Sequence, residues 1–476
     1  MRGGSLATCF VGPWRAEPDR PVLRDVDGRW LTGRELDERT ADGADRFHAA
    51  GLATGDRLLL CGRSSAALVI AYVAALRAGL AVVPVNPDYR QSEVERIVHA
   101  ARPSAAAAEA QTCARLVAEA SGIPTTELDL AGLASGAGPP GRAIDASAPD
   151  DPALLVYTSG TTGAPKGALL SHGNLLAGAR AVVAAWRWTP DDRLLLTLPL
   201  FHMHGLGVGI NGSFAAGGQV VLRPAFDAAD VARRCREGGL TMFFGVPAMY
   251  GRLLEGGHAG ALGSLRLIVS GSAPLPAGQS DAVADAAGQR PLERYGMTET
   301  VMITSNPLDG PRKPGKVGVP LPGVELRLSR EDGEVQVRGP SVIAGYDRGY
   351  GDADAFTTDG WFRTGDLGRL DEDGHLELIG RSKELIISGG FNVHPREVEE
   401  VLAGFPGVRE VAVVGRRSDT WGEAVTAVVV ADRPVDPQAL RAFASERLAT
   451  YKVPKAVEFA DALPRNALGK VIRREL

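Results

Sequence analysis

The chain has 476 residues, of which 45% are apolar and 23% charged, a composition typical of globular proteins. This length exceeds one ordinary domain, so we expect two to four structural units. The net charge of -5 excludes the broad basic surface that binding to nucleic acid or an anionic membrane requires. Any anion is therefore expected to be bound locally, by a few residues.

Neither the cysteines nor the apolar segments indicate export or membrane insertion. The four cysteines lie far apart and form no C-x-x-C pair, which favours a reduced, cytoplasmic protein. The N-terminus lacks the pattern of a secretory signal. The most apolar run, residues 66–76, is much shorter than the roughly 20 residues needed to span a bilayer. We expect this run to be a buried helix.

The first part of the chain alternates short apolar runs with helical patterns. Apolar runs at 58–61 and 81–85 alternate with helical patterns at 33–50 and 65–78, which predicts α/β layers with buried, largely parallel strands. A stretch rich in Gly, Pro, Ala and Ser at 134–151 predicts a surface linker.

A second series of apolar runs predicts further strands, and a change of pattern follows it. The runs lie at 194–198, 220–222, 242–246 and 267–269. Residues 315–347 then show strand-like alternation around the turn Asp332-Gly333, which predicts a small β-rich unit.

The last predicted boundary lies in the segment GRSK at 380–383, between apolar strands at 375–379 and 385–387. Beyond it, helical patterns at 395–402 and 437–448 and strands at 408–414 and 425–430 predict a compact α+β module. The predicted fold class is α/β. A large N-terminal domain of layered α/β subdomains with the small β-rich unit spans residues 1–380, and a small α+β C-terminal domain spans residues 381–476.

The segment LVYTSGTTGAPKG at 155–167 has the chemistry of a phosphate-binding loop. Its glycines let backbone N–H groups approach phosphate oxygens, and its hydroxyl groups surround Lys166, one of only seven lysines in the chain. The spacing differs from G-x-x-x-x-G-K-[ST], which disfavours a kinase or GTPase. The alternative is a Ser/Thr/Gly-rich surface linker, which leaves the single lysine unexplained.

Five further segments complete a recognisable set: PLFHMHG at 199–205, SGSAPLP at 270–276, ERYGMTET at 293–300, FRTGD at 362–366 and PRNALGK at 464–470. With the phosphate loop, in this order along nearly the entire chain, they resemble the adenylate-forming superfamily of acyl-CoA synthetases, nonribosomal adenylation domains and luciferases. The resemblance implies a two-step reaction. A carboxylate attacks the α-phosphorus of ATP and releases pyrophosphate, and a thiol then displaces AMP from the acyl-adenylate.

The resemblance also implies roles for individual residues in binding ATP and Mg²⁺. Thr298 matches a phosphate contact, Glu299 the Mg²⁺ carboxylate, and Asp366 and Arg381 the ribose contacts. The family's polyphosphate loop falls on Thr158, Ser159, Gly160, Thr161, Thr162 and Lys166, and its adenine pocket on Gly271, Ser272, Ala273 and Tyr295.

In the family, the C-terminal domain is mobile and carries a catalytic lysine, which Lys470 matches; the alternative is an ordinary surface lysine. Lys383 matches the hinge about which the small domain rotates to exchange the lysine for a coenzyme A channel. Gly389 and Gly390 would then approach pantetheine, where side chains would obstruct the tunnel.

The acid pocket is expected to include His202, Met203 and Met302. Since a carboxylic acid is already ionised at neutral pH, His202 is interpreted as a wall or gate of the pocket and not as a base, with a core histidine as the alternative. His204 is a weaker candidate for the same role.

The resemblance implies that Arg294, the residue before Tyr-Gly in ERYGMTET, lines the acid pocket. It is then the best indication of the substrate, because a guanidinium in a mostly closed pocket needs a carboxylate partner. The segments around it look like malonyl-CoA synthetases of the same superfamily, in which three residues surround the distal carboxylate. Those residues fall on Arg252, Ser272 and Arg294. The alternative is that Arg294 pairs with Glu293 and that Arg252 faces water.

The sequence thus predicts a magnesium-dependent, AMP-forming acyl-CoA synthetase for a small dicarboxylic acid, malonate or methylmalonate, with ATP and coenzyme A as the other substrates. Three alternatives stay open. They are a ligase for a neutral short- or medium-chain acid, an adenylation enzyme that loads a carrier protein, and a non-enzymatic nucleotide sensor. No partner other than small molecules is expected, and the oligomeric state is left open.

Overall fold

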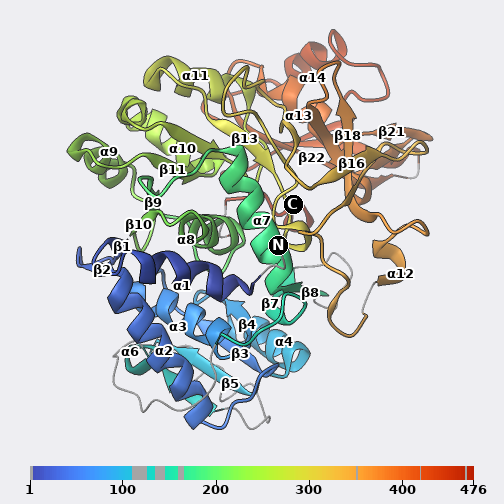
Figure 1. Cartoon of the computed structure of the whole chain (residues 1–476). Coiled ribbons are helices and arrows are strands. Elements are labelled where there is room, and N and C mark those ends of the chain that lie inside the picture. Colours follow the sequence, from blue (N-terminus) through green and yellow to red (C-terminus); the bar gives the residue numbers. More distant parts are fainter. Residues whose placement is uncertain are drawn as a thin grey trace.

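The structure is a computed structural model that describes residues 4–109, 126–133, 145–158, 166–349, 352–418, 420–466 and 469–476. Within these ranges the strands form four sheets (Figure 1). Three of them are each built from one stretch of the chain, whereas the largest sheet also takes its edge strands β1 and β2 from the N-terminus. Residues 134–144 of the predicted linker at 134–151, and residues 159–165 of the phosphate loop, lie outside the described residues.

The first sheet is built from the N-terminal third of the chain, and its core strands β3, β4 and β5 run parallel. The predicted helix at 66–76 is confirmed as α3 (Ala66–Arg77), which begins where the Ser65 side chain accepts from Leu68 N and is buried along its length. The strand order is β6 (Thr126–Asp129), β5 (Ala105–Ala108), β3 (Arg57–Cys61), β4 (Ala81–Val85), β7 (Pro152–Thr158) and β8 (Lys166–Ser171). Its helices are α2 (Gly33–Ala49), α3, α4 (Gln91–Ala101) and α6 (Leu130–Leu133).

The second and largest sheet carries four adjacent parallel strands, β9 to β12, with β13 continuing in parallel. Their carboxyl ends share one edge, where ligands bind in open α/β sheets. The order is β15 (Val319–Pro320), β14 (Thr304–Ser305), β13 (Leu292–Tyr295), β12 (Leu267–Ser270), β11 (Met242–Gly245), β9 (Arg193–Leu196), β10 (Gln219–Leu222), β1 (Pro21–Arg24) and β2 (Trp30–Thr32).

Helices connect these strands or pack against them, as the alternating pattern predicts (Figure 1). They are α1 (Leu6–Ala16), α7 (His172–Ala185), α8 (Asn211–Ala215), α9 (Ala228–Glu237), α10 (Pro247–Glu255) and α11 (Ala277–Ala287), with 3₁₀ turns η2 (Ala259–Ser264) and η3 (Thr298–Thr300). Residues His204–Ile210 form a π-helix, η1. This element is not predicted from the sequence, and such irregular turns are frequent at functional sites.

The small β-rich unit predicted at 315–347 is part of an antiparallel sheet that extends further along the chain. The sheet contains β16 (Glu325–Leu328), β17 (Glu334–Arg338), β18 (Phe362–Leu370) and β19 (Leu376–Arg381), with η4 (Asp347–Gly349) and α12 (Asp352–Ala355) beside it, whereas β15 belongs to the large sheet. The predicted turn at Asp332-Gly333 joins β16 to β17, and Gly333 adopts a φ of 76° there. Only glycine takes that conformation without strain.

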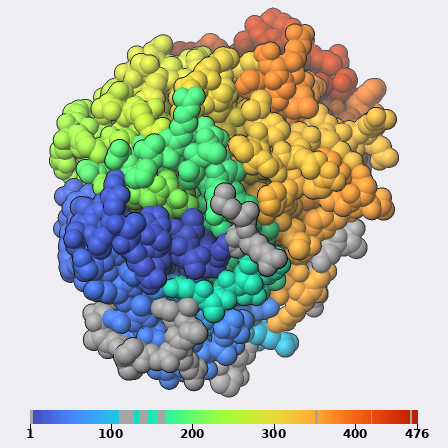
Figure 2. All heavy atoms as spheres, viewed as in Figure 1, coloured from blue at the N-terminus to red at the C-terminus, as the bar shows by residue number. Residues whose placement is uncertain are grey.

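The fourth sheet contains β20 (Ile386–Ser388), β21 (Phe391–Val393), β22 (Val408–Ser418), β23 (Gly422–Ala431) and β24 (Ala456–Phe459), with α13 (Pro395–Ala403), α14 (Pro437–Ser445) and the terminal turn η6 (Arg473–Glu475). The chain passes into it from β19 through η5 (Ser382–Glu384). The domain division at 380/381 stays a prediction. In the space-filling view, the orange and red C-terminal residues lie against the yellow residues of the preceding part (Figure 2).

Two further observations bear on the sequence expectations. None of the described helices is both long enough and apolar enough to cross a membrane. Cys9 and Cys235 are free thiols, but Cys61 at the end of β3 is disulfide-bonded, which departs from the reduced state expected for the cysteines.

Candidate active site

Arg294 lies next to the end of β13 and is only 6% exposed. Its guanidinium packs directly on the backbone of Gly271, where an added Cβ would collide with Nε and Cζ. The Nε and NH2 atoms are buried, and none of the described residues accepts a hydrogen bond from them. Burial lowers the pKa of Arg294 to about 9, so the group still carries its charge at neutral pH. The site therefore contains a buried cation to which the described part of the chain supplies no acceptor at Nε or NH2.

Glu293 does not supply that anion. Successive side chains of a strand point to opposite faces of the sheet. Glu293 accepts a 3.1 Å hydrogen bond from Gly315 N, and burial raises its pKa to about 7. The alternative in which Arg294 pairs with its neighbour is therefore not what the structure shows.

Arg252 is not brought into this pocket. It is exposed on α10, and its guanidinium lies 5.1 Å from the ring of Phe226, which packs against Phe243. His204, in contrast, stacks on Phe244. Phe243 and Phe244 are successive residues of β11, so their side chains point to opposite faces of the sheet, and Arg252 and His204 lie on opposite faces as well. The expectation that Arg252 shares a carboxylate with Arg294 is corrected here, because α10 buries Tyr250 and Leu253 and leaves Arg252 outside.

His204, the weaker candidate in the sequence, lies deeper than His202. It is 4% exposed, and its Nδ1 lies 3.3 Å from Ser272 Oγ. Burial, followed by the charge of Arg294, lowers the pKa of His204 well below its usual value, so the ring is neutral. Ser272 adopts a φ of 70°, an uncommon conformation for a residue with a side chain. His204, Ser272 and Arg294 thus form one group around the edge of the sheet.

Of the other predicted acid-pocket residues, His202 and Met203 directly precede η1 and Met302 follows η3. His202 is partly buried, with its ring centroid 4.5 Å from that of Phe201, and burial lowers its pKa to about 4. His202 is therefore uncharged at neutral pH, which suits a wall of the pocket better than a positively charged contact to the acid. Met203 is partly buried and Met302 is fully buried.

Asp366 on β18 is a buried carboxylate with both oxygens engaged. Tyr295, at the end of β13, donates its hydroxyl to Oδ2 at 2.5 Å, and Arg381 Nε lies 2.9 Å from Oδ1. Asp366 and Arg381 face each other in the β18–β19 register. Three residues that the sequence assigned to nucleotide binding are therefore adjacent. Ala273 is partly buried in the loop after β12.

Lys470 reaches the same cluster from the C-terminal part of the chain. Its backbone N–H donates to Asn466 Oδ1 at 2.9 Å, and the preceding Gly469 sits so close to α10 that an added Cβ would lie 3.2 Å from Ala248 Cβ. Burial, then Arg381, lowers the pKa of Lys470, while Glu384 and Asp366 oppose that effect. The lysine is therefore half-buried at the surface of the larger part of the molecule.

The predicted hinge and coenzyme A residues lie on the small fourth sheet and its entry. Lys383 is exposed in η5. Gly389 and Gly390 are exposed in the β20–β21 turn with φ values of 59° and 81°, and Gly389 N donates to Trp421 O at 2.8 Å. Their predicted roles concern a second orientation of the small domain and stay predictions.

The described residues that are predicted to contact phosphate and Mg²⁺ lie on β8 and η3. Lys166, the first residue of β8, has its Nζ 5.3 Å from the ring centroid of Tyr346, whose hydroxyl donates to Glu299 Oε1 at 2.9 Å. Glu299 is 5% exposed, and burial raises its pKa. Thr298 precedes it in η3. Ser159, Gly160, Thr161, Thr162 and the side chain of Thr158 lie outside the described residues.

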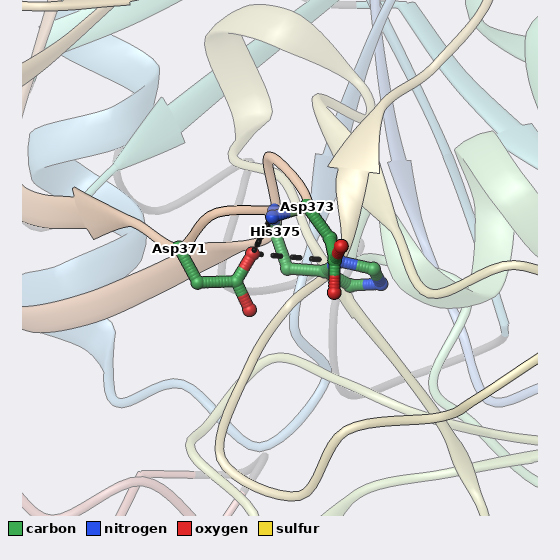
Figure 3. A group of neighbouring side chains, drawn as sticks. All are labelled: Asp371, Asp373 and His375. Carbon is green, nitrogen blue, oxygen red and sulfur yellow. Dashed lines mark hydrogen bonds and ion pairs between the residues drawn. The ribbon is translucent and has the colours of Figure 1, made fainter.

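One other cluster resembles a metal site: Asp371, Asp373 and His375 in the β18–β19 turn (Figure 3). Asp371 Oδ1 accepts the backbone N–H groups of Asp373 and His375, at 3.0 and 2.9 Å. Its Oδ2 accepts the ammonium groups of Lys313 and Lys316, at 2.7 and 2.6 Å. Two cations on one carboxylate oxygen oppose a third. We interpret this cluster as a set of hydrogen bonds and ion pairs that stabilises the turn.

Family models match both parts of the chain. Residues 13–347 match the AMP-binding enzyme family, and residues 397–470 match the AMP-binding enzyme C-terminal domain. The chain therefore belongs to the AMP-binding enzyme family.

Known relatives narrow the class to acid–thiol ligases. A feruloyl-CoA synthase from Amycolatopsis sp is 37% identical over 501 residues, covering 100% of this chain and 99% of that protein. A malonate–CoA ligase from Arabidopsis thaliana is 39% identical over 367 residues, covering 69% of this chain and 60% of that protein. The crystal structure of ATP-bound MatB from Rhodopseudomonas palustris superposes with a TM-score of 0.93 at 37% identity, covering 98% of both chains. The chain is a CoA ligase of this family.

Proposed function

We propose that the enzyme activates a small dicarboxylic acid, malonate or methylmalonate, with ATP and transfers the acyl group to coenzyme A. The observation that carries the proposal is the buried guanidinium of Arg294, whose Nε and NH2 find no acceptor among the described residues. A substrate with two carboxylates reacts through one and supplies the missing anion with the other. Bidentate pairing with a planar carboxylate favours it over a methyl or amide group.

In the first half-reaction the reacting carboxylate attacks the α-phosphorus of ATP, an acyl-adenylate forms, and pyrophosphate leaves. The site supplies cations where negative charge gathers, and such electrostatic stabilisation is often the largest contribution to catalysis. Lys470 beside Asp366 and Arg381 is assigned to the forming acyl phosphate, and Lys166 to the polyphosphate. Asp366 is assigned to the ribose hydroxyls, because a carboxylate can accept from both.

Glu299 fits the role of Mg²⁺ ligand, since a buried carboxylate with a raised pKa gains a compensating charge when it binds a cation. Mg²⁺ would neutralise charge on the phosphate oxygens. In the second half-reaction the thiol of coenzyme A attacks the acyl carbonyl carbon and AMP leaves. We assign Gly389 and Gly390 to the pantetheine path after a rotation at Lys383.

The test is AMP release with ATP, Mg²⁺ and coenzyme A, using malonate, methylmalonate, succinate, acetate, butyrate and octanoate. Malonate and methylmalonate should give the highest kcat/KM, and should differ little because one methyl group is worth only about 1 to 3 kcal/mol. A lead for butyrate or octanoate would contradict the role of Arg294 and favour a neutral acid. Product mass with coenzyme A present or absent separates a CoA ligase from an enzyme that loads a carrier protein.

A further inference from the structure

Tyr346 lies in a segment that several parts of the molecule hold in place. Its backbone forms an antiparallel bridge with Ala168 of β8, two residues after Lys166. Asn174 of α7 donates two 2.9 Å hydrogen bonds to backbone carbonyl groups earlier in the segment. The next residue, Asp347, accepts two hydrogen bonds from Arg57 of β3, at 2.9 and 2.7 Å. The position of the Tyr346 side chain is thereby set from both sides.

This side chain contacts two residues from distant parts of the sequence. Its hydroxyl donates to Glu299 Oε1 at 2.9 Å, and the Glu299 backbone carbonyl also accepts from Ile343 N at 2.9 Å. The Lys166 ammonium lies 5.3 Å from the centroid of its ring, within the range of a cation–π interaction. A single side chain therefore links the proposed metal ligand with the proposed phosphate lysine.

The chemistry of these contacts suits a positioning role. A hydrogen bond to one carboxylate oxygen fixes the rotation of the carboxylate and leaves it able to accept a cation with its remaining lone pairs. A ring beneath an ammonium group limits the rotamers of a long side chain without removing its charge or its three donors. Both contacts reduce the conformational entropy that the side chains of Glu299 and Lys166 lose when ATP and its cation bind.

We propose that Tyr346 is a positioning residue for adenylation: its hydroxyl orients Glu299 for the divalent cation, and its ring orients Lys166 for the polyphosphate. This inference rests on the proposed roles of Glu299 and Lys166. It assigns two separable tasks to two parts of one side chain, so two substitutions can divide them.

The test measures binding in the absence of turnover. Mn²⁺ replaces Mg²⁺, its free concentration is followed by electron paramagnetic resonance, and α,β-methylene-ATP serves as the nucleotide because its α–β linkage resists cleavage. Tyr346→Phe keeps the ring and should weaken Mn²⁺ binding about tenfold, as expected on losing a hydrogen bond to a metal-ligating carboxylate. The affinity for the nucleotide analogue without divalent cation should not change. Tyr346→Leu should also weaken that metal-free affinity, by about fivefold.

A matched control is Tyr72→Phe, which removes another buried tyrosine hydroxyl, one that donates to Asn211 at 3.2 Å, and should alter neither affinity. Wild-type Mn²⁺ affinity in Tyr346→Phe overturns the hydroxyl's role, and wild-type metal-free affinity in Tyr346→Leu overturns that of the ring. Glu299→Gln distinguishes a failure of the role proposed for Tyr346 from a failure of the role proposed for Glu299. If it weakens Mn²⁺ binding while Tyr346→Phe does not, only the present inference fails. If it leaves Mn²⁺ binding intact, the metal assignment of Glu299 fails as well.

Discussion

Arg294 and Asp366 are two buried charges of opposite sign, 6% and 5% exposed, and they differ in what surrounds them. Asp366 has a donor on each oxygen, from Tyr295 and Arg381. The Nε and NH2 atoms of Arg294 have no acceptor among the described residues. The proposed nucleotide end of the site is thus electrostatically complete in the absence of ATP, whereas the proposed acid end would be completed by its ligand. Specificity for the acid is therefore expected to depend on one charge, and nucleotide binding on a shared network.

The strongest test of this contrast is Arg294→Met. Removing one partner of a buried ion pair costs roughly 3 to 5 kcal/mol, so kcat/KM for malonate should fall by about 10³-fold, while that for butyrate should hold or rise. Steady-state kinetics with both acids checks the result. Arg252→Met is the matched control, since Arg252 is exposed on the other face of the sheet, and its kcat/KM for malonate should change less than about twofold. A large loss in Arg252→Met would restore the arginine pair expected from the sequence.

The nucleotide end is tested by Lys470→Ala. Pyrophosphate exchange, which reports adenylation, should fall by about 10²-fold because a cation is lost where charge develops. Attack of coenzyme A on supplied acyl-adenylate should stay largely intact, since in the proposed rotation the small domain exchanges Lys470 for the thiol channel before this step. Equal loss in both half-reactions would show that Lys470 holds the domain in place and does not act on the acyl phosphate.

Gly271→Ala sharpens the comparison, because the sequence assigned Gly271 to adenine and the structure places it beneath Arg294. The added methyl group collides with the guanidinium, and overpacking costs about 1 to 3 kcal/mol. We expect kcat/KM for malonate to fall by about 10-fold to 100-fold with the KM for ATP nearly unchanged. A raised KM for ATP with normal use of malonate would support the adenine role.

The last test concerns stability and not activity, and involves Glu293, the neighbour of Arg294 on β13. Its folded-state pKa of about 7 lies above the ordinary value of 4.5, so its contribution to stability is complete below pH 4.5 and is lost as the pH rises through 7. Glu293→Gln mimics the protonated form. The variant's free energy of unfolding relative to that of the wild type should rise between pH 5 and pH 8, by up to roughly 3 kcal/mol. Melting temperatures of both proteins across this pH range check the result. Parallel pH curves would contradict this, and Glu331→Gln, at an exposed position, is the control.

The sequence predicted the layers well because buried parallel strands and their helices leave continuous apolar runs, as at β3, β4 and α3. It predicted the residues near Asp366 through their motifs, but not that Tyr295 bonds Asp366 from 71 positions away. It ranked His202 above His204, although the sequence alone does not show which of two neighbouring histidines is buried. The π-helix η1 begins at His204 and buries that ring. Tyr346 lies in none of the six motifs, so its contacts could be found only in three dimensions.

The edge of the large sheet has a consequence for how such enzymes diversify. Ser272 and Arg294, which we propose face the acid, lie just after β12 and near the end of β13, whereas Lys166 and Tyr346 belong to other segments. Mutation at a few strand ends can therefore change the acid while ATP activation is inherited intact. Relatives named for ferulate and for malonate resemble this chain to almost the same degree. If Arg294 selects the acid, as we propose, enzymes that use different acids can share most of their sequence and differ at this strand end.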